Sequence, residues 1–134
     1  MTDPSLLPWA VSAASSFALG GFWYSPLLFL KPWMQANAAS GSLEAPGAKH
    51  PARVFGISFL FSLLASFGFG LLVGEHPGIG HGLHVGLVAG LGLVGASFGI
   101  NYQFSNRSIA LWLIDAGYHL CQFLVFGLVY GLLG

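Results

Sequence analysis

Asp115 and His119 lie four residues apart in the last long apolar stretch of the chain, residues 109–133, together with Tyr118 and Gln122. The stretch is long enough to cross a bilayer as a helix. At ~100° per residue, the four polar side chains fall on one side of that helix. A charged group at hydrocarbon depth costs roughly 2.5–3.5 kcal/mol on insertion scales, so we expect these side chains to face protein or water.

Buried polar groups in such a helix need partners on neighbouring segments. The candidates are Ser16, Tyr24, Asn101 and Tyr102, of which Tyr24 and Asn101 lie nearest the expected depth. We therefore predict one polar intramembrane cluster, made of Asp115, His119, Tyr118, Gln122, Asn101 and Tyr24.

Three interpretations of this cluster are open. It is a hydrogen-bonded network that ties the last helix to its neighbours, or it is a site that handles a proton or a solute. The second interpretation rests on the ability of intramembrane carboxyl and imidazole groups to exchange protons with a cavity. The third makes His119 the ligand of a haem or a metal. The prediction includes no cofactor and no catalytic residue.

A second group of ionisable residues, around residues 75–84, would lie at the opposite end of the helices. His81 and His84 are one helical turn apart, a spacing compatible with a shared zinc or copper ion. Interfacial histidines need no metal, so we predict no metal site and keep only secondary candidates: His81, His84, His76 and Glu75.

The composition indicates a membrane protein. The chain is 55% hydrophobic and only 6% charged, whereas soluble domains carry about a quarter charged residues. The apolar residues form four runs of bilayer-spanning length, at about 6–30, 53–74, 79–100 and 109–133. These runs predict an all-α protein, with one domain over residues 1–134 that forms a four-helix transmembrane bundle. Its helices pair as antiparallel hairpins 1-2 and 3-4, with an inner loop at residues 31–52.

Charge predicts the orientation in the membrane. All four basic residues fall on one side of the expected helices, whereas Asp3 and Glu75 fall on the other. Because basic residues in short loops stay cytoplasmic, loops 31–52 and 102–108 are expected inside and both termini outside a cell (inner) membrane. The basic residues are Lys31, Lys49, Arg53 and Arg107.

Small residues recur at every fourth position in the two middle helices. Because lipid supplies no hydrophobic force for helix association, close backbone packing through small residues drives it instead. We predict that the two ladders face each other and that Gly86→Ile disrupts this hairpin. The ladders are Ser58, Ser62, Ser66, Gly70 and Gly74 in the first helix, and Gly78, Gly82, Gly86 and Gly90 in the second.

Two motifs together resemble the DUF1761 family of small multi-pass bacterial membrane proteins. The first is GFWYSPLLF at 21–29 followed by KPWM at 31–34. The second is NYQF at 101–104, Arg107, and LWLIDAGYH at 111–119. The sequence departs from the family pattern at Leu30, where glycine is expected. The resemblance implies a four-helix membrane fold and no particular activity.

These observations favour a non-enzymatic membrane protein whose polar cluster lines a small cavity for a proton, an ion or a small solute, as in a transporter. The competing interpretation is a structural or accessory subunit of a larger membrane complex. An intramembrane redox or hydrolytic enzyme ranks third. The expected partners are the lipid bilayer and either further copies of the chain or a membrane-complex subunit. A formal net charge of zero argues against nucleic acid as a partner.

Overall fold

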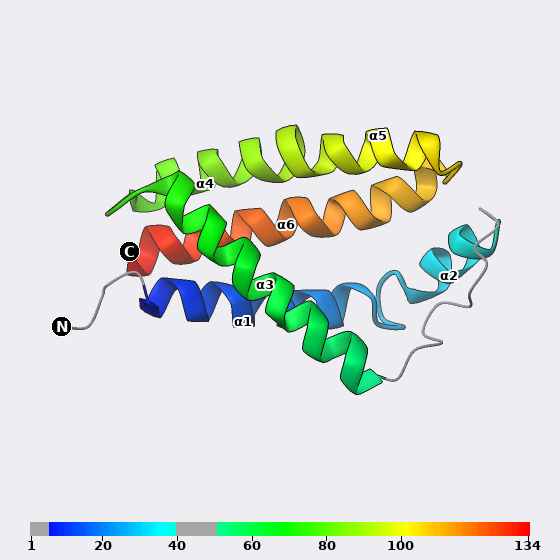
Figure 1. Ribbon diagram of the computed structural model, residues 1–134, viewed down its shortest axis with the longest axis horizontal. Coiled ribbons are helices and arrows are strands. Elements are labelled where there is room, and N and C mark those ends of the chain that lie inside the picture. Colours follow the sequence, from blue (N-terminus) through cyan, green and yellow to red (C-terminus); the bar gives the residue numbers. More distant parts are fainter. Residues whose placement is uncertain (1–5, 40–50) are drawn as a thin grey trace.

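The computed structural model describes residues 6–39 and 51–134, and no strand occurs among them. One continuous helix is built from three segments, α4, η1 and α5 (Figure 1). The elements in chain order are α1 (Leu6–Trp23), α2 (Leu30–Ala39), α3 (Pro51–Val73), α4 (Gly78–Leu87), η1 (Val88–Gly95), α5 (Ala96–Phe104) and α6 (Ile109–Leu133).

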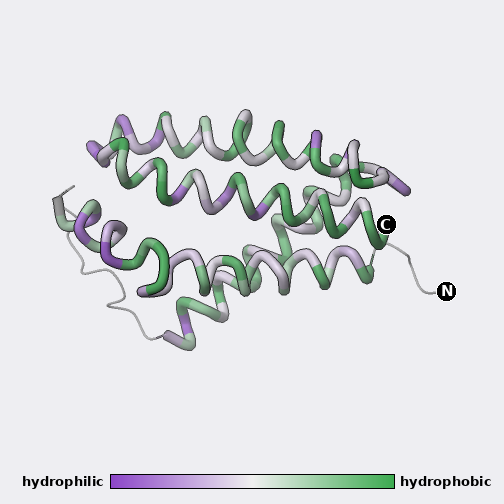
Figure 2. Tube along the Cα trace, turned by 180° about the vertical axis from the view of Figure 1, so that it is seen from behind, coloured by the Kyte–Doolittle hydropathy of each residue, from purple (hydrophilic) through white to green (hydrophobic). Residues whose placement is uncertain are grey.

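Four helices are long and apolar enough to cross a membrane: α1, α3, the continuous α4–η1–α5 helix, and α6. The predicted all-α fold of four membrane-spanning helices is therefore confirmed. One end of the bundle holds the start of α1, the α3–α4 turn and Gly134, and the other holds α2 and the α5–α6 turn (Figure 1). We call them the Gly134 end and the α2 end. Hydrophilic positions gather mainly at the α2 end (Figure 2).

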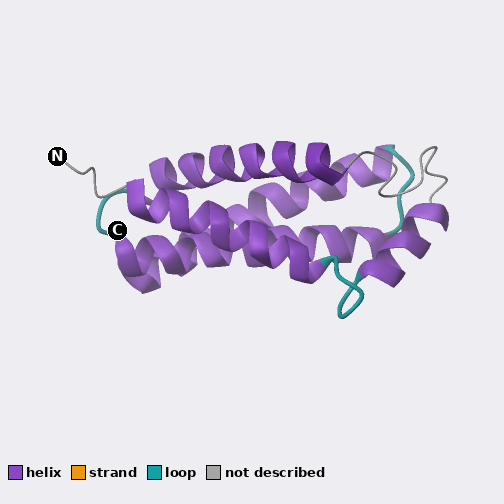
Figure 3. Ribbon diagram, turned by 90° about the horizontal axis from the view of Figure 1, so that it is seen from below, coloured by secondary structure: helices purple, strands orange, loops and turns teal. Residues whose placement is uncertain are grey.

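The helices pair as two antiparallel hairpins, α1 with α3 and the α4–η1–α5 helix with α6 (Figures 1 and 3). α6 lies between the other elements and contacts every one of them. Near the Gly134 end, Phe69 of α3 packs against Phe123, Phe126 and Tyr130 of α6, with ring centroids 5.7–6.0 Å apart. This aromatic contact joins the two hairpins.

The predicted packing of the two small-residue ladders against each other is wrong. The continuous helix packs mainly on α6 and touches α3 only near their shared turn. A Cβ atom on Gly82 would overlap the backbone oxygen of Gly127, and one on Gly86 would overlap that of Phe123. Two members of the α3 ladder face other helices instead: Ser66 Oγ donates to the Trp9 carbonyl of α1 at 2.9 Å, and Gly70 lies against Tyr130 of α6.

The first predicted helix, 6–30, ends earlier than expected, at Trp23. Residues 24–29 form turns, because Pro26 lacks a backbone donor and restricts the residue before it. Ser25 secures the break: its Oγ donates to the Phe22 carbonyl at 2.7 Å and accepts from the Leu27 N–H at 3.3 Å.

The predicted inner loop, 31–52, is also corrected at both of its ends. Leu30–Ala39 is the helix α2, and α3 begins at Pro51 rather than at residue 53. Proline suits the first turn of a helix, where its missing N–H would have had no helical partner. Residues 40–50 of that loop, with Lys49, lie outside the described part of the chain, as does Asp3.

The π-helical segment η1 has no counterpart in the sequence predictions, which treat 79–100 as regular α-helix. The helix also continues past residue 100 to Phe104. Within η1, a Cβ on Gly95 would lie 3.0 Å from the Gly90 oxygen. The backbone of the π-helical turn therefore leaves little room for a side chain at this glycine. The Gly95 carbonyl accepts a hydrogen bond from Trp112 Nε1 of α6 at 2.9 Å, which satisfies a backbone group at the end of the irregular segment.

Candidate functional site

Asp115 is the centre of a polar cluster near the α2 end of the bundle. Tyr24 Oη donates to Asp115 Oδ1 at 2.6 Å, and Tyr102 Oη donates to Asp115 Oδ2 at 2.5 Å. The three residues come from α6, from the turn after α1 and from α5. Through these two short hydrogen bonds, one carboxyl group connects three parts of the chain.

The break after α1 places Tyr24 beside this carboxylate. Its ring packs edge-on against Trp33 of α2, with centroids 5.5 Å apart. The preceding residue, Trp23, donates from Nε1 to the Ile114 carbonyl at 2.9 Å, which fixes the turn against α6. Burial and the adjacent Asp115 carboxylate raise the pKa of Tyr24. Its phenol therefore keeps the proton that it donates.

Tyr102 is held from the other side by Arg107. The Arg107 guanidinium lies 5.8 Å from the centre of the Tyr102 ring, within the range of a cation–π contact. Arg107 Nη1 also donates to Asn37 Oδ1 at 3.0 Å, and Asn37 Nδ2 donates to the Trp33 carbonyl at 2.9 Å. This chain of contacts ties α2 to the site.

His119 lies one helical turn beyond Asp115, toward the middle of α6. Its Nδ1 is 2.8 Å from Oε1 of the buried Gln122. With that oxygen as acceptor, Nδ1 is the donor of this hydrogen bond. The imidazole stacks on Phe98 of α5 at a centroid distance of 4.9 Å and an angle of 16°. Phe98 also lines a shallow depression of about 350 Å³, and His119 itself is partly exposed.

The structure separates the hydrogen bonds of the predicted cluster into three sets. Asp115 binds Tyr24, and His119 binds Gln122, whereas Tyr118 turns to α1 and donates from Oη to the Ser16 carbonyl at 3.0 Å. Asn101 is exposed and lines the shallow depression. Tyr102, the other candidate in the same motif, occupies the place expected for Asn101.

Sequence reasoning missed the contribution of α2 to this site. Asn37 is not among the predicted site residues, and Arg107 enters the sequence predictions only through its charge and its place in the second motif. The two residues are 70 positions apart in the chain, and no local pattern pairs them. The signal that could have pointed to Arg107 is its place in the NYQF–Arg motif.

The secondary metal candidates do not assemble into a site. Within residues 6–39 and 51–134, no group of three or more His, Cys, Asp or Glu side chains is arranged to hold a metal ion. The candidate side chains are exposed at the Gly134 end: Glu75, His76, His81 and His84.

Chemically, the cluster combines a carboxylate, an imidazole and several phenols in one small volume. Carboxyl and imidazole groups can take up and release protons, and the Tyr118 ring contacts both the Tyr24 ring and the His119 imidazole, with centroids 5.7 and 4.9 Å apart. A family model described as a protein of unknown function (DUF1761) matches residues 7–131, which include the whole cluster. No curated protein and no solved structure significantly matches the chain.

Proposed function

Because the chain belongs to the DUF1761 family, whose function is unknown, we propose its role from the geometry of the site. The proposal is a non-enzymatic, multi-pass membrane protein that handles a proton, an ion or a small solute at Asp115 and His119. The observation that carries it is the Asp115 carboxylate, which accepts two phenol hydrogen bonds at 2.6 and 2.5 Å inside a bundle of apolar helices.

The cost of such a carboxylate supports a functional role. An ionisable side chain within a membrane costs free energy. Such side chains almost always face the bundle interior or a water-filled cavity, and they mark proton and ion pathways. Both Asp115 oxygens accept phenol hydrogen bonds, which hold the carboxyl group in one orientation between three parts of the chain.

The surroundings of His119 support an access route from the side of α5. Phe98 contacts the imidazole and also lines the shallow depression. The imidazole is itself only partly buried, and we propose that displacement of the Phe98 ring widens the access to it. The two titratable groups, Asp115 and His119, would then lie along one face of α6 from the α2 end toward the middle of the helix.

The test is proton flux through the purified protein in liposomes that contain a pH-sensitive dye, driven by a potassium–valinomycin potential. We expect wild-type flux above that of empty liposomes and a loss of about tenfold or more in Asp115→Asn, because the amide cannot carry the exchanged proton. Tyr118→Phe is the matched control, since its hydroxyl binds a backbone carbonyl outside the pair. Equal flux in wild-type and Asp115→Asn liposomes would rule out proton handling at this site.

A second candidate is an accessory subunit that docks on a larger membrane complex. It is favoured by the small share of each spanning helix that is buried inside the chain, 22% for three of them and 33% for α6. The remaining surface is available to lipid, to further copies of the chain or to a partner. A stable companion after native purification, together with flux no higher than that of empty liposomes, would favour this candidate.

We propose a cell (inner) membrane location with the Gly134 end outside, because Lys31, Arg53 and Arg107 lie toward the α2 end and basic loops stay cytoplasmic. Alkaline phosphatase fused after Gly134 should be active, and a green fluorescent protein fused there should be dark. The opposite pair of results would reverse the orientation.

A further inference from the structure

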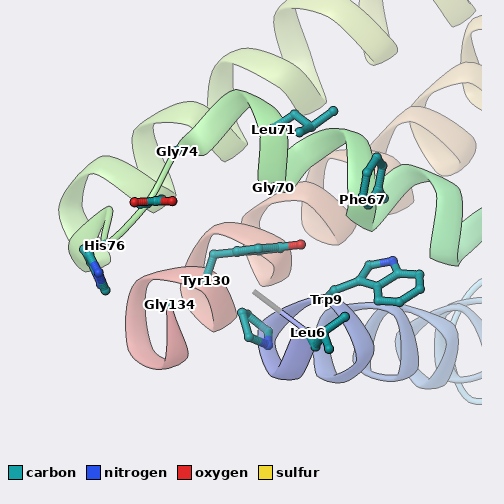
Figure 4. A pocket seen from close by; sticks show the side chains of 11 residues that line it. Leu6, Trp9, Phe67, Gly70, Leu71, Gly74, His76, Tyr130 and Gly134 are labelled. Atoms are coloured by element: carbon teal, nitrogen blue, oxygen red, sulfur yellow. The ribbon is translucent and has the colours of Figure 1, made fainter. Parts of the chain in front are cut away.

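A cavity of about 460 Å³ opens at the Gly134 end, far from Asp115, between α1, α3 and the end of α6 (Figure 4). Leu6 and Trp9 of α1 form one side of it, and Tyr130 reaches across from α6 toward Gly70 of α3 (Figure 4). Glu75 and His76, in the α3–α4 turn, also line it. Its volume is that of a small-molecule site.

Hydrogen bonds to backbone carbonyls hold the aromatic walls in place. Trp9 Nε1 donates to the Leu63 carbonyl at 2.8 Å, and Tyr130 Oη donates to the Ser66 carbonyl at 2.9 Å. Ser66 Oγ in turn donates to the Trp9 carbonyl at 2.9 Å. The walls are therefore fixed before any ligand enters, which lowers the entropic cost of binding.

Two glycines keep the cavity open on the side of α3. A Cβ on Gly70 would lie 2.6 Å from Tyr130 Oη, so a larger residue would displace the tyrosine. Gly74 has a φ of 80°, a backbone conformation that side-chain-bearing residues rarely adopt. Neither position can carry a side chain that fills the space without a local rearrangement.

The lining favours a particular class of ligand. Trp9, Phe67 and Tyr130 offer aromatic surface, and the rings of Trp and Tyr attract cations most strongly. Glu75 adds a carboxylate and His76 an imidazole, whereas the other lining residues are apolar, aromatic or glycine. A ligand with an apolar body and one positive charge matches both features.

We propose that this cavity binds an amphipathic organic cation, with its apolar body against Trp9 and Phe67 and its positive head near Glu75. The site is distinct from the Asp115 cluster, and the proposal goes beyond the proposed function without depending on it.

The probe is benzyltrimethylammonium, and its neutral carbon isostere, neopentylbenzene, is the matched ligand. Both are titrated calorimetrically into the protein in nanodiscs of zwitterionic lipid, with empty nanodiscs subtracted. We expect saturable binding of the cation, at least threefold tighter than that of the isostere. Glu75→Gln should weaken cation binding about threefold and leave isostere binding unchanged, and Trp9→Leu should weaken cation binding about fivefold.

His81→Ala is the control variant, because His81 is exposed at the same end but does not line the cavity. It should bind the cation as the wild type does. Glu75→Gln alters an exposed turn residue, so it remains informative if Trp9→Leu does not fold. Equal affinity for the cation and the isostere would mean a purely apolar cavity, suited to a lipid chain, and would overturn the proposal. Absence of saturable binding, or an unchanged cation affinity in Glu75→Gln, would overturn it as well.

Discussion

Gly127→Ala is expected to lower the free energy of unfolding by about 3 kcal/mol, and Gly127→Val is expected to prevent stable folding. A Cβ on Gly127 would overlap the backbone oxygen of Gly82, and a Cβ on Gly82 would overlap that of Gly127. The obstacle is backbone on both sides, so no side chain can move out of the way. Overpacking typically costs about 1–3 kcal/mol, and occasionally more, when the surroundings must shift.

Gly92→Ala and Gly80→Ala provide matched controls on the partner helix, since a Cβ at either position meets nothing within 4 Å. Each should leave the stability unchanged or raise it by up to about 1 kcal/mol, the usual gain for Gly→Ala within a helix. Equilibrium unfolding in mixed micelles measures all the variants. If Gly127→Ala behaved like Gly92→Ala, the close contact of α4 with α6 would be refuted.

The same contact shows where sequence reasoning reached its limit. The four-residue spacing in 78–90 correctly marks one face of a helix, but α3 and α6 both present small residues at that interval. A periodic pattern identifies a face and not the partner of that face. Which helix packs against that face depends on the arrangement of all four helices. The α3–α4 turn does not force its two helices to pack along their length. Gly86→Ile should still be destabilising, because it would meet the Phe123 backbone of α6.

The error at Asn101 has a specific physical cause in η1. The choice of Asn101 rests on its expected depth, which assumes a regular α-helix with ~1.5 Å rise per residue throughout. Each π-type turn holds roughly one residue more than an α-turn, so the residues beyond Gly95 are shifted along the helix by roughly one position. Tyr102 then occupies the place that a regular helix would give to Asn101. The predicted regular helix at 79–100 therefore does not contain this irregular segment.

The helix α2 could not be predicted for a different reason. Its sequence contains Pro32 and Asn37 and lacks an apolar stripe, so local propensity favours a loop. The structure stabilises it by distant contacts: Trp33 packs on Tyr24, and Asn37 binds Arg107. By contrast, the last spanning helix and the position of Asp115 within it follow directly from hydropathy and from the cost of a buried charge.

Asp115→Ala is expected to lower the free energy of unfolding by about 3 kcal/mol. The substitution removes the acceptor of two phenols at once, and a hydrogen bond to a charged group is worth about 1.5–3 kcal/mol. Asp115→Asn should cost only about 1 kcal/mol, because the amide oxygen still accepts from one of the two tyrosines. Tyr24→Phe and Tyr102→Phe should each cost about 1–2 kcal/mol, and combining either of them with Asp115→Ala should add little further loss.

This order of stabilities separates the architectural role of Asp115 from its proposed chemistry. If Asp115 only ties helices together, each variant should lose flux in proportion to its loss of stability. Asp115→Ala would then be more impaired than Asp115→Asn in both measurements. A proton-handling carboxylate predicts instead that Asp115→Asn, which keeps most of the stability, already loses the flux. Equal stabilities of the Ala and Asn variants would contradict the two-phenol geometry itself, because only the alanine leaves both Tyr24 and Tyr102 without their acceptor.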